Sequence, residues 1–247
     1  MIPRLLAYLF KLGVLITLFN RLFFCITKKG CWLSNVVSSN HDGDSEKFLT
    51  PVASALRDSG YIVLDGVFQT EALQLLLIDI KNRSSDEFHV AGVGRSQGYQ
   101  KNPFVRRDRI CWLSETTPQA AFYFKWMKAL QQKLNQNFFL GLNDFECHYA
   151  HYPKGAFYKK HLDAFKDKTS RRVTTILYLN PAWSPDNGGE LIIYEKDSEQ
   201  ILEKVEPFFG RMVIFLSEDF PHEVLPVNKS RYSLTGWFRN DGQPVVS

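Results

Sequence analysis

The sequence contains few cysteines and lacks the paired cysteines that bind zinc or exchange disulfides. Its four cysteines are Cys25, Cys31, Cys111 and Cys147, and no two of them form a Cys-x-x-Cys pair. A secreted chain held together by disulfides would carry a denser cysteine framework. We therefore expect reduced, mostly buried thiols and a cytoplasmic location.

The chain also lacks a glycine-rich phosphate loop, a zinc finger and a helix-turn-helix pattern. Its formal net charge of +4 is too small to indicate nucleic-acid binding by itself. We expect no nucleic-acid partner.

No uninterrupted apolar run is long enough to span a membrane with ease. Residues 5–27 are strongly apolar, but Lys11 and Arg21 interrupt them. Three interpretations stay open for this segment: a membrane-associating helix, a signal sequence, or a segment with no membrane role, including a start codon placed too far upstream. The polar residues 34–47 are typical of a linker.

Apolar residues make up 45% and aromatic residues 14% of the whole chain, which predicts one sizeable domain or at most two small ones. We divide the chain into the N-terminal segment and linker (1–47), a helical support region (48–140) and a β-rich core (141–247). Thr50 is expected to cap a first helix. The expected strands are 61–68, 110–113, 145–152, 158–163, 172–180, 190–194, 211–216, 222–227 and 231–239. This pattern predicts a mostly β fold with packed helices, as a sandwich or jelly roll.

One histidine and one aspartate, His161 and Asp163, stand two residues apart in the stretch YKKHLDAFKDK. Alone, the pair could equally be ordinary polar residues on a charged surface. His222, in EDFPHEVLPV, offers a third ligand from a distant strand. Two histidines and one carboxylate are the facial triad that holds Fe(II) and leaves coordination positions open. Because alternate residues of a strand share a face, we expect both side chains of the pair to point the same way.

A co-substrate such as 2-oxoglutarate would need a buried cation for its distal carboxylate. Arg231 begins the strand that follows His222, and its guanidinium can grip a carboxylate with two hydrogen bonds. Tyr178 shares one face of its strand with Thr174 and Ile176, so its hydroxyl could bind the same carboxylate.

The segments HLD, TTILYLNPAWSPDNGGELIIY and GRMVIFLSEDFPHEVLPVNKSRYSLTGWF together resemble the 2-oxoglutarate- and Fe(II)-dependent prolyl hydroxylases, in particular the oxygen-sensing branch and its bacterial relatives. The resemblance runs from about residue 48 to 239. It implies a double-stranded β-helix (jelly roll), and it assigns iron to His161, Asp163 and His222 and the co-substrate carboxylate to Arg231 and Tyr178. Collagen-type prolyl hydroxylases carry a lysine at the position of Arg231.

The resemblance also implies roles for residues around the metal. Tyr152 and Thr235 are implied near the co-substrate, and Trp237 as a pocket wall. The segment VRRDRICWL is similar to a loop on the substrate side, which makes Asp108 and Arg109 weaker substrate candidates.

The resemblance implies hydroxylation of a prolyl residue in a protein, with a translation component as one candidate, and use of Fe(II), 2-oxoglutarate, dioxygen and ascorbate. The alternatives are a small-molecule or lipid hydroxylase and a non-catalytic metal-binding interaction or sensor module. The basic side chains around His161 could be a solvated rim or a docking site for an acidic partner; they are Lys159, Lys160, Lys166, Lys168, Arg171 and Arg172. His148 and His151, three apart on one strand, should face opposite ways and form no second metal site.

Overall fold

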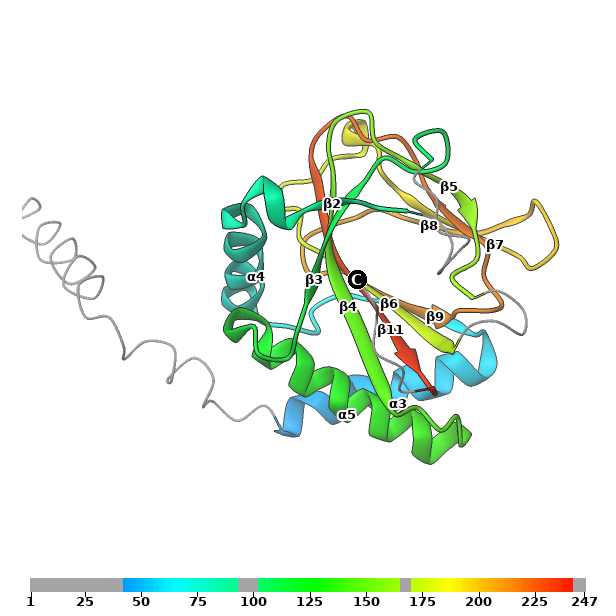
Figure 1. Ribbon diagram of the computed structural model, residues 1–247. Coiled ribbons are helices and arrows are strands. Elements are labelled where there is room, and N and C mark those ends of the chain that lie inside the picture. Colours follow the sequence, from blue (N-terminus) through cyan, green and yellow to red (C-terminus); the bar gives the residue numbers. More distant parts are fainter. Residues whose placement is uncertain (1–41, 93–101, 165–169, 242–247) are drawn as a thin grey trace, which may run out of the picture. The chain divides into compact units, whose positions relative to one another are not determined.

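The structure is a computed structural model that describes residues 42–92, 102–164 and 170–241. Within these residues the chain forms two antiparallel β-sheets and three α-helices (Figure 1). The apolar segment 5–27 lies outside these residues, as do Lys166 and Lys168. Within the described residues, no helix combines the length and the apolar character needed to cross a membrane.

The larger sheet has seven strands in the order β1-β9-β6-β11-β4-β3-β2. Their bounds are β1 Tyr61–Leu64, β2 His89–Val90, β3 Arg109–Leu113, β4 Asp144–Tyr152, β6 Arg171–Tyr178, β9 Met212–Leu216 and β11 Arg231–Arg239. The smaller sheet has four strands in the order β5-β10-β7-β8. Their bounds are β5 Tyr158–His161, β7 Leu191–Tyr194, β8 Ile201–Val205 and β10 His222–Val224.

The helices cover the outer face of the larger sheet (Figure 1). They are α3 (Asp42–Asp58), α4 (Thr70–Asn82) and α5 (Ala121–Phe138). Three 3-10 turns occur elsewhere in the chain: η1 (Ser85–Glu87) after α4, η3 (Pro118–Ala120) before α5 and η4 (Pro185–Asn187) between β6 and β7. Buried leucines of all three helices pack against this face. The expected helical region 48–140 therefore supplies the cover, and it also contributes β1, β2 and β3 to the sheet.

Strand alternation separates two apolar cores. On β6, Leu177 packs beneath the helices, whereas its neighbour Tyr178 faces the smaller sheet. Tyr149 and Ala150 on β4 divide in the same way. The second core lies between the sheets, so the alternate positions of β4, β6 and β11 line the space in which a site can form.

The predicted cap at Thr50 is wrong, because α3 begins at Asp42 and contains Pro51. The Thr50 hydroxyl donates back to Glu46, and Lys133 of α5 pairs with the same carboxylate at 2.5 Å. Pro51 lies in the interior of this 17-residue helix, where a proline costs one backbone hydrogen bond and crowds the carbonyl four residues before it.

Each expected strand is present, and all but β11 have shifted ends, whereas β2 and β8 were not predicted. Ile201 and Leu202 of β8 are exposed, and only Val205 of the strand is buried. An edge strand of this kind carries little of the apolar alternation on which strand prediction depends.

Candidate metal centre and co-substrate pocket

The structure brings the three predicted metal ligands together. His161 on β5 and His222 on β10 lie directly opposite each other in adjacent strands. One carboxylate oxygen of Asp163 lies 3.6 Å from Nε2 of His161, and the other lies 3.6 Å from Nε2 of His222. Nitrogen and oxygen atoms from all three residues lie within 4.8 Å of one another.

Both imidazoles are held by the backbone through the nitrogen that faces away from this cluster. Nδ1 of His161 lies 2.8 Å from the Lys159 carbonyl oxygen, and Nδ1 of His222 lies 2.9 Å from that of Phe220. A carbonyl can only accept, so each Nδ1 carries the proton and each Nε2 keeps a free lone pair. That tautomer is the one a metal-binding histidine needs.

The charge states of the cluster also suit a cation. Burial and the neighbouring His161 lower the pKa of His222 to about 4, so its ring is neutral at pH 7. Burial acts to raise the pKa of Asp163, but His222, His161 and Arg171 outweigh it and hold that pKa below its usual range. Two imidazoles, of which that of His222 is neutral, and one carboxylate therefore form a donor set that fits Fe(II).

The reason for the position of Asp163 differs from the prediction. β5 ends at His161, and Asp163 lies in a bend beyond the strand, so strand alternation does not orient it. Its carboxylate is instead held by the Thr174 hydroxyl on β6, which donates to Oδ2 at 2.9 Å. The sequence placed Thr174 on the correct face but gave no sign of this contact.

Arg231 and Tyr178 lie next to each other in the core between the sheets. The guanidinium carbon of Arg231 is 4.9 Å from the ring centroid of Tyr178 and 4.9 Å from that of Tyr152. Arg231 is only 1% exposed, yet its Nε has no hydrogen-bond partner, and neither does the buried Tyr178 hydroxyl. Buried polar groups left open in this way are expected where a ligand completes them.

Gly189, which follows Gly188 in the same turn, leaves room for the Arg231 side chain. Gly189 has a φ of +72°, and a Cβ there would lie 3.0 Å from Cδ of Arg231 and 2.6 Å from Cγ1 of Val227. At Gly188 a Cβ would lie 2.4 Å from the Pro226 carbonyl oxygen. Only glycine fits here, so the turn is shaped around the arginine.

The remaining co-substrate and wall candidates line the same space. Tyr152 pairs with Arg231 across β4 and β11, and Thr235 lies between His148 and Ile176 on the flanking strands. Trp237 is buried with its indole nitrogen unpartnered, and the Arg171 guanidinium stacks on its ring at 3.6 Å.

The two weaker substrate candidates are adjacent residues at the start of β3: Asp108 is buried, whereas Arg109 is exposed. Asp108 is fully buried and bound by Arg106 through two hydrogen bonds of 2.8 and 2.6 Å. Arg106 also stacks on the Tyr158 ring, which in turn stacks on His161. Asp108 therefore supports a metal ligand through a chain of contacts, and Arg106, which the sequence reading overlooked, is the link.

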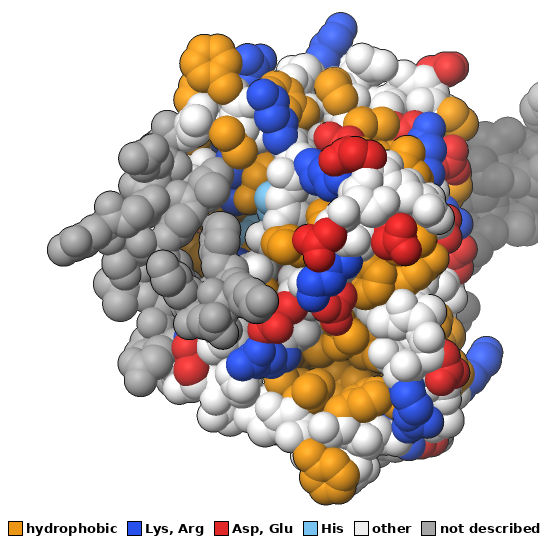
Figure 2. Space-filling model, turned by 90° about the vertical axis from the view of Figure 1, so that its right-hand side faces the viewer, with side chains coloured by type: hydrophobic (Ala, Val, Ile, Leu, Met, Phe, Trp, Pro, Cys, Tyr) orange, Lys and Arg blue, Asp and Glu red, His pale blue; other side chains and the backbone are white. Residues whose placement is uncertain are grey.

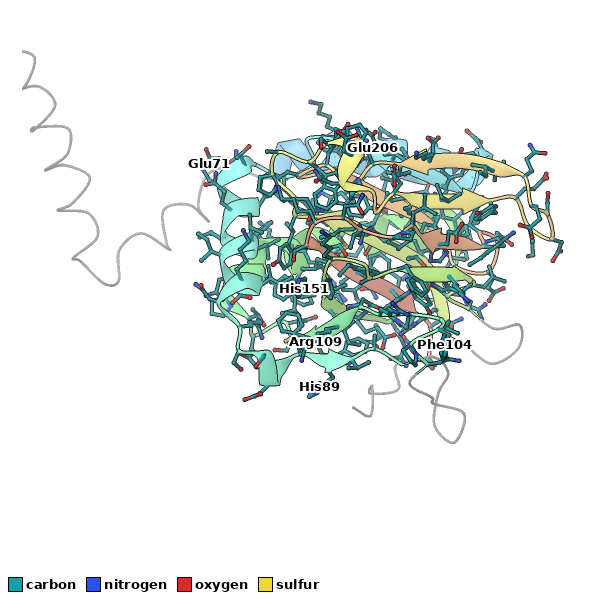
Figure 3. The ribbon with its side chains drawn as sticks, turned by 90° about the horizontal axis from the view of Figure 1, so that it is seen from above. Glu71, His89, Phe104, Arg109, His151 and Glu206 are labelled. Atoms are coloured by element: carbon teal, nitrogen blue, oxygen red, sulfur yellow. The ribbon has the colours of Figure 1, made fainter. Side chains whose placement is uncertain are left out.

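Arg109 is exposed and pairs with His151 on the outer side of β4 (Figure 3). The structure does not bring it to the metal ligands. His151 stacks on Tyr232, whereas His148 is buried between Trp112 and Trp237. The two histidines thus face opposite ways, as predicted.

Most of the described basic side chains around His161 have acidic partners. Lys160 pairs with Glu199, Arg171 with Glu146 and Arg172 with Glu218. Basic and acidic side chains alternate over the coloured part of the face in Figure 2. Within the described residues Lys159 alone of this group lacks an ion pair, which favours a solvated rim over an acidic docking site.

Residues 147–239 match the sequence profile of the 2OG-Fe(II) oxygenase superfamily. The chain is 37% identical to a prolyl-4-hydroxylase of Pseudomonas putida, with a TM-score of 0.71, over 78% of this chain and 100% of that one. The chain belongs to the 2OG-Fe(II) oxygenase superfamily. Its prolyl hydroxylase branch has a double-stranded β-helix, and the two sheets described above are that fold.

Two further members of the superfamily are similar over most of this chain. Human Egl nine homolog 1 is 27% identical over 195 residues, which are 76% of this chain and 45% of the human protein. The structure of a prolyl hydroxylase of Trichoplax adhaerens was solved with a peptide fragment of the hypoxia inducible factor. It is 24% identical to this chain, with a TM-score of 0.71, and the match covers 81% of this chain and 92% of the Trichoplax chain. The chain thus spans under half the length of its human relative. Membership of the superfamily implies Fe(II), 2-oxoglutarate and dioxygen.

Proposed function

We propose that the protein is a dioxygenase that uses Fe(II) and 2-oxoglutarate to hydroxylate a prolyl residue in a protein. One observation carries this proposal: the same core between the two sheets contacts the three-ligand cluster, through His222 on Phe215, and holds Tyr178 beside Arg231, where the Tyr178 hydroxyl and the Arg231 Nε lack partners. Each feature alone has other interpretations. Together they provide a metal site and a buried carboxylate site.

The residues divide the work between them. His161, Asp163 and His222 hold the iron, and Arg231 with the Tyr178 hydroxyl binds the distal carboxylate of 2-oxoglutarate by charge-assisted hydrogen bonds. When bound, iron and 2-oxoglutarate supply the oxidising chemistry: one oxygen atom of O₂ goes to succinate, the other to a substrate C–H bond, and CO₂ leaves. The surrounding apolar side chains exclude water from this site, and ascorbate is proposed to keep the iron reduced.

The substrate is inferred from the relatives. The Pseudomonas protein is named a prolyl-4-hydroxylase, and the Trichoplax protein binds a peptide fragment. We extend prolyl hydroxylation of a protein to this chain on that similarity. A translation component as the substrate rests on the family resemblance alone.

Succinate production tests the chemistry. Purified protein supplied with Fe(II), 2-oxoglutarate and ascorbate should convert some 2-oxoglutarate to succinate even without its substrate. The His222→Ala variant should lose this turnover, whereas His151→Ala, which removes a histidine outside the cluster, should keep it. Absence of both turnover and iron binding in the unaltered protein would exclude the enzyme, whereas iron binding without turnover would favour the non-catalytic metal-binding module.

The substrate requires a separate experiment. Proteins captured by an Asp163→Ala variant are identified by mass spectrometry, then incubated with the active enzyme and searched for a proline that has gained one oxygen atom. Transfer of the oxygen to a lipid or other small molecule would favour the alternative hydroxylase.

We further propose a cytoplasmic location, with membrane contact through residues 5–27. This rests on the cysteine content and on the apolar composition of that segment. Fractionation of the full chain beside a chain that starts near Ser45 tests it: loss of membrane association on truncation is expected, and equal distribution of both would refute the contact.

A further inference from the structure

The third metal ligand is anchored differently from the other two. His161 and His222 lie on paired strands, and each ring is fixed by a backbone carbonyl. Asp163 lies in a bend beyond the end of β5, where no strand pairing holds its backbone. Its orientation must therefore come from side-chain contacts.

Thr174 makes that contact from the opposite sheet. It lies in the interior of β6, paired to β9 on one side and β11 on the other, and it is fully buried. Its hydroxyl donates to Oδ2 of Asp163 at 2.9 Å. The branched Cβ of threonine restricts its χ1 angle, so a threonine on a central strand holds a carboxylate from a rigid position.

A second buried hydroxyl completes the arrangement. Oγ of Ser217 lies 2.9 Å from Oγ1 of Thr174, and Ser217 is also fully buried. The Thr174 hydroxyl has one proton, which it donates to the carboxylate. It therefore accepts from Ser217, and this bond sets the direction of the donated proton.

We propose that Thr174, oriented by Ser217, is a positioning residue that ties Oδ2 of Asp163 to β6 and leaves Oδ1 to ligate the metal through one oxygen. This inference rests on the proposed function, since it assigns a role at the same metal site. Monodentate ligation keeps one more coordination position open for co-substrate and dioxygen. Partners that orient metal ligands typically change metal affinity by about 10–100-fold when removed.

The chain offers a matched control in the next residue. Thr175 is also fully buried on β6, but it faces the helices, and its hydroxyl contacts the Gly236 carbonyl and the Tyr123 hydroxyl. Valine replaces threonine with nearly the same shape and no hydroxyl. Thr174→Val and Thr175→Val therefore each lose a buried hydroxyl, and only the first loses it at the metal site.

The test measures metal binding without turnover. Mn(II) affinity is determined by calorimetry for the full-length chain, for both valine variants and for Thr174→Ser, together with the melting temperature of the metal-free proteins. We expect Thr174→Val to bind Mn(II) about 10–100-fold more weakly, Thr174→Ser to restore most of the affinity, and Thr175→Val to bind as the unaltered chain does.

Equal Mn(II) affinity in the unaltered chain and Thr174→Val would overturn the inference, as would an equal loss in both valine variants, which would mean a general packing effect. Failure of the unaltered chain to bind Mn(II) would instead refute the proposed metal site. The two failures are therefore distinguishable.

Discussion

Replacing Arg231 with methionine should stabilise the protein without its co-substrate and abolish tight binding of 2-oxoglutarate. Arg231 is a fully buried cation that forms no ion pair among the described residues, and its Nε has no hydrogen-bond partner. The rings of Tyr152 and Tyr178 are the neighbours that compensate its charge. Removal of the charge relieves this desolvation cost and also removes the carboxylate-binding group.

The magnitudes follow from burial. Truncating one partner of a buried, hydrogen-bonded charge pair weakens binding by about 2–5 kcal/mol. The dissociation constant of 2-oxoglutarate should therefore increase by a factor between about 30 and several thousand. Replacing a buried ion pair by apolar side chains is often neutral or stabilising by about 1–4 kcal/mol, and we expect a gain within this range when the lone buried charge of Arg231 is removed. In a domain of this size, each kcal/mol shifts the melting temperature by about 2–4 °C.

Arg239 provides the control from the same strand. It is equally buried, but it pairs with Glu146 at 2.9 Å and Asp241 at 2.7 Å. Arg239→Met removes these ion pairs and leaves the buried Glu146 with Arg171 as its printed partner, so the variant should be less stable than the unaltered protein.

The assay combines melting curves of the ligand-free proteins with calorimetric titration of 2-oxoglutarate in the presence of Mn(II). The reasoning is refuted if Arg231→Met melts as far below the unaltered protein as Arg239→Met does. It is also refuted if Arg231→Met keeps the original affinity for 2-oxoglutarate.

Gly189→Ala should lower the free energy of unfolding by about 1–3 kcal/mol more than Gly66→Ala does, because of overpacking. Both glycines have a positive φ, so both variants share the backbone strain, but no atom lies within 4 Å of a Cβ at Gly66. Urea unfolding compares the two, and equal losses would contradict the proposed close fit around Arg231. His148→Leu should make the free energy of unfolding depend less on pH on the acid side. Burial, with Arg106, lowers the pKa of His148 to about 3 in the folded protein. Between about pH 6.5 and 3 only the unfolded chain therefore binds that proton, and the free energy of unfolding falls with acid by up to about 1.4 kcal/mol per pH unit. Unfolding free energies at several pH values would contradict this if both proteins gave the same slope.

The sequence was sufficient for most of the strands and for the metal ligands, because both leave local signals. Alternation of apolar residues marks a strand such as β6, and the chemistry of Fe(II) restricts which residue types can complete a His-x-Asp pair. Arg231 was accessible for the same reason, since a buried carboxylate needs a cation.

The contacts between distant segments could not be predicted from the sequence. Nothing near Thr174 in the sequence indicates that its hydroxyl reaches Asp163, and nothing near Tyr158 indicates that the Arg106 guanidinium stacks on its ring. The ion pair between Glu46 of α3 and Lys133 of α5 is a further contact of this kind. Such contacts depend on how the elements pack, which periodicity does not encode.

The most direct test of the account is a crystal structure of the protein with Mn(II) and 2-oxoglutarate, with the metal located by anomalous scattering. We expect one metal peak bonded to Nε2 of His161, Nε2 of His222 and the carboxylate of Asp163, with the distal carboxylate of 2-oxoglutarate on Arg231 and Tyr178. A metal bound elsewhere, or a 2-oxoglutarate that does not contact Arg231, would contradict the account.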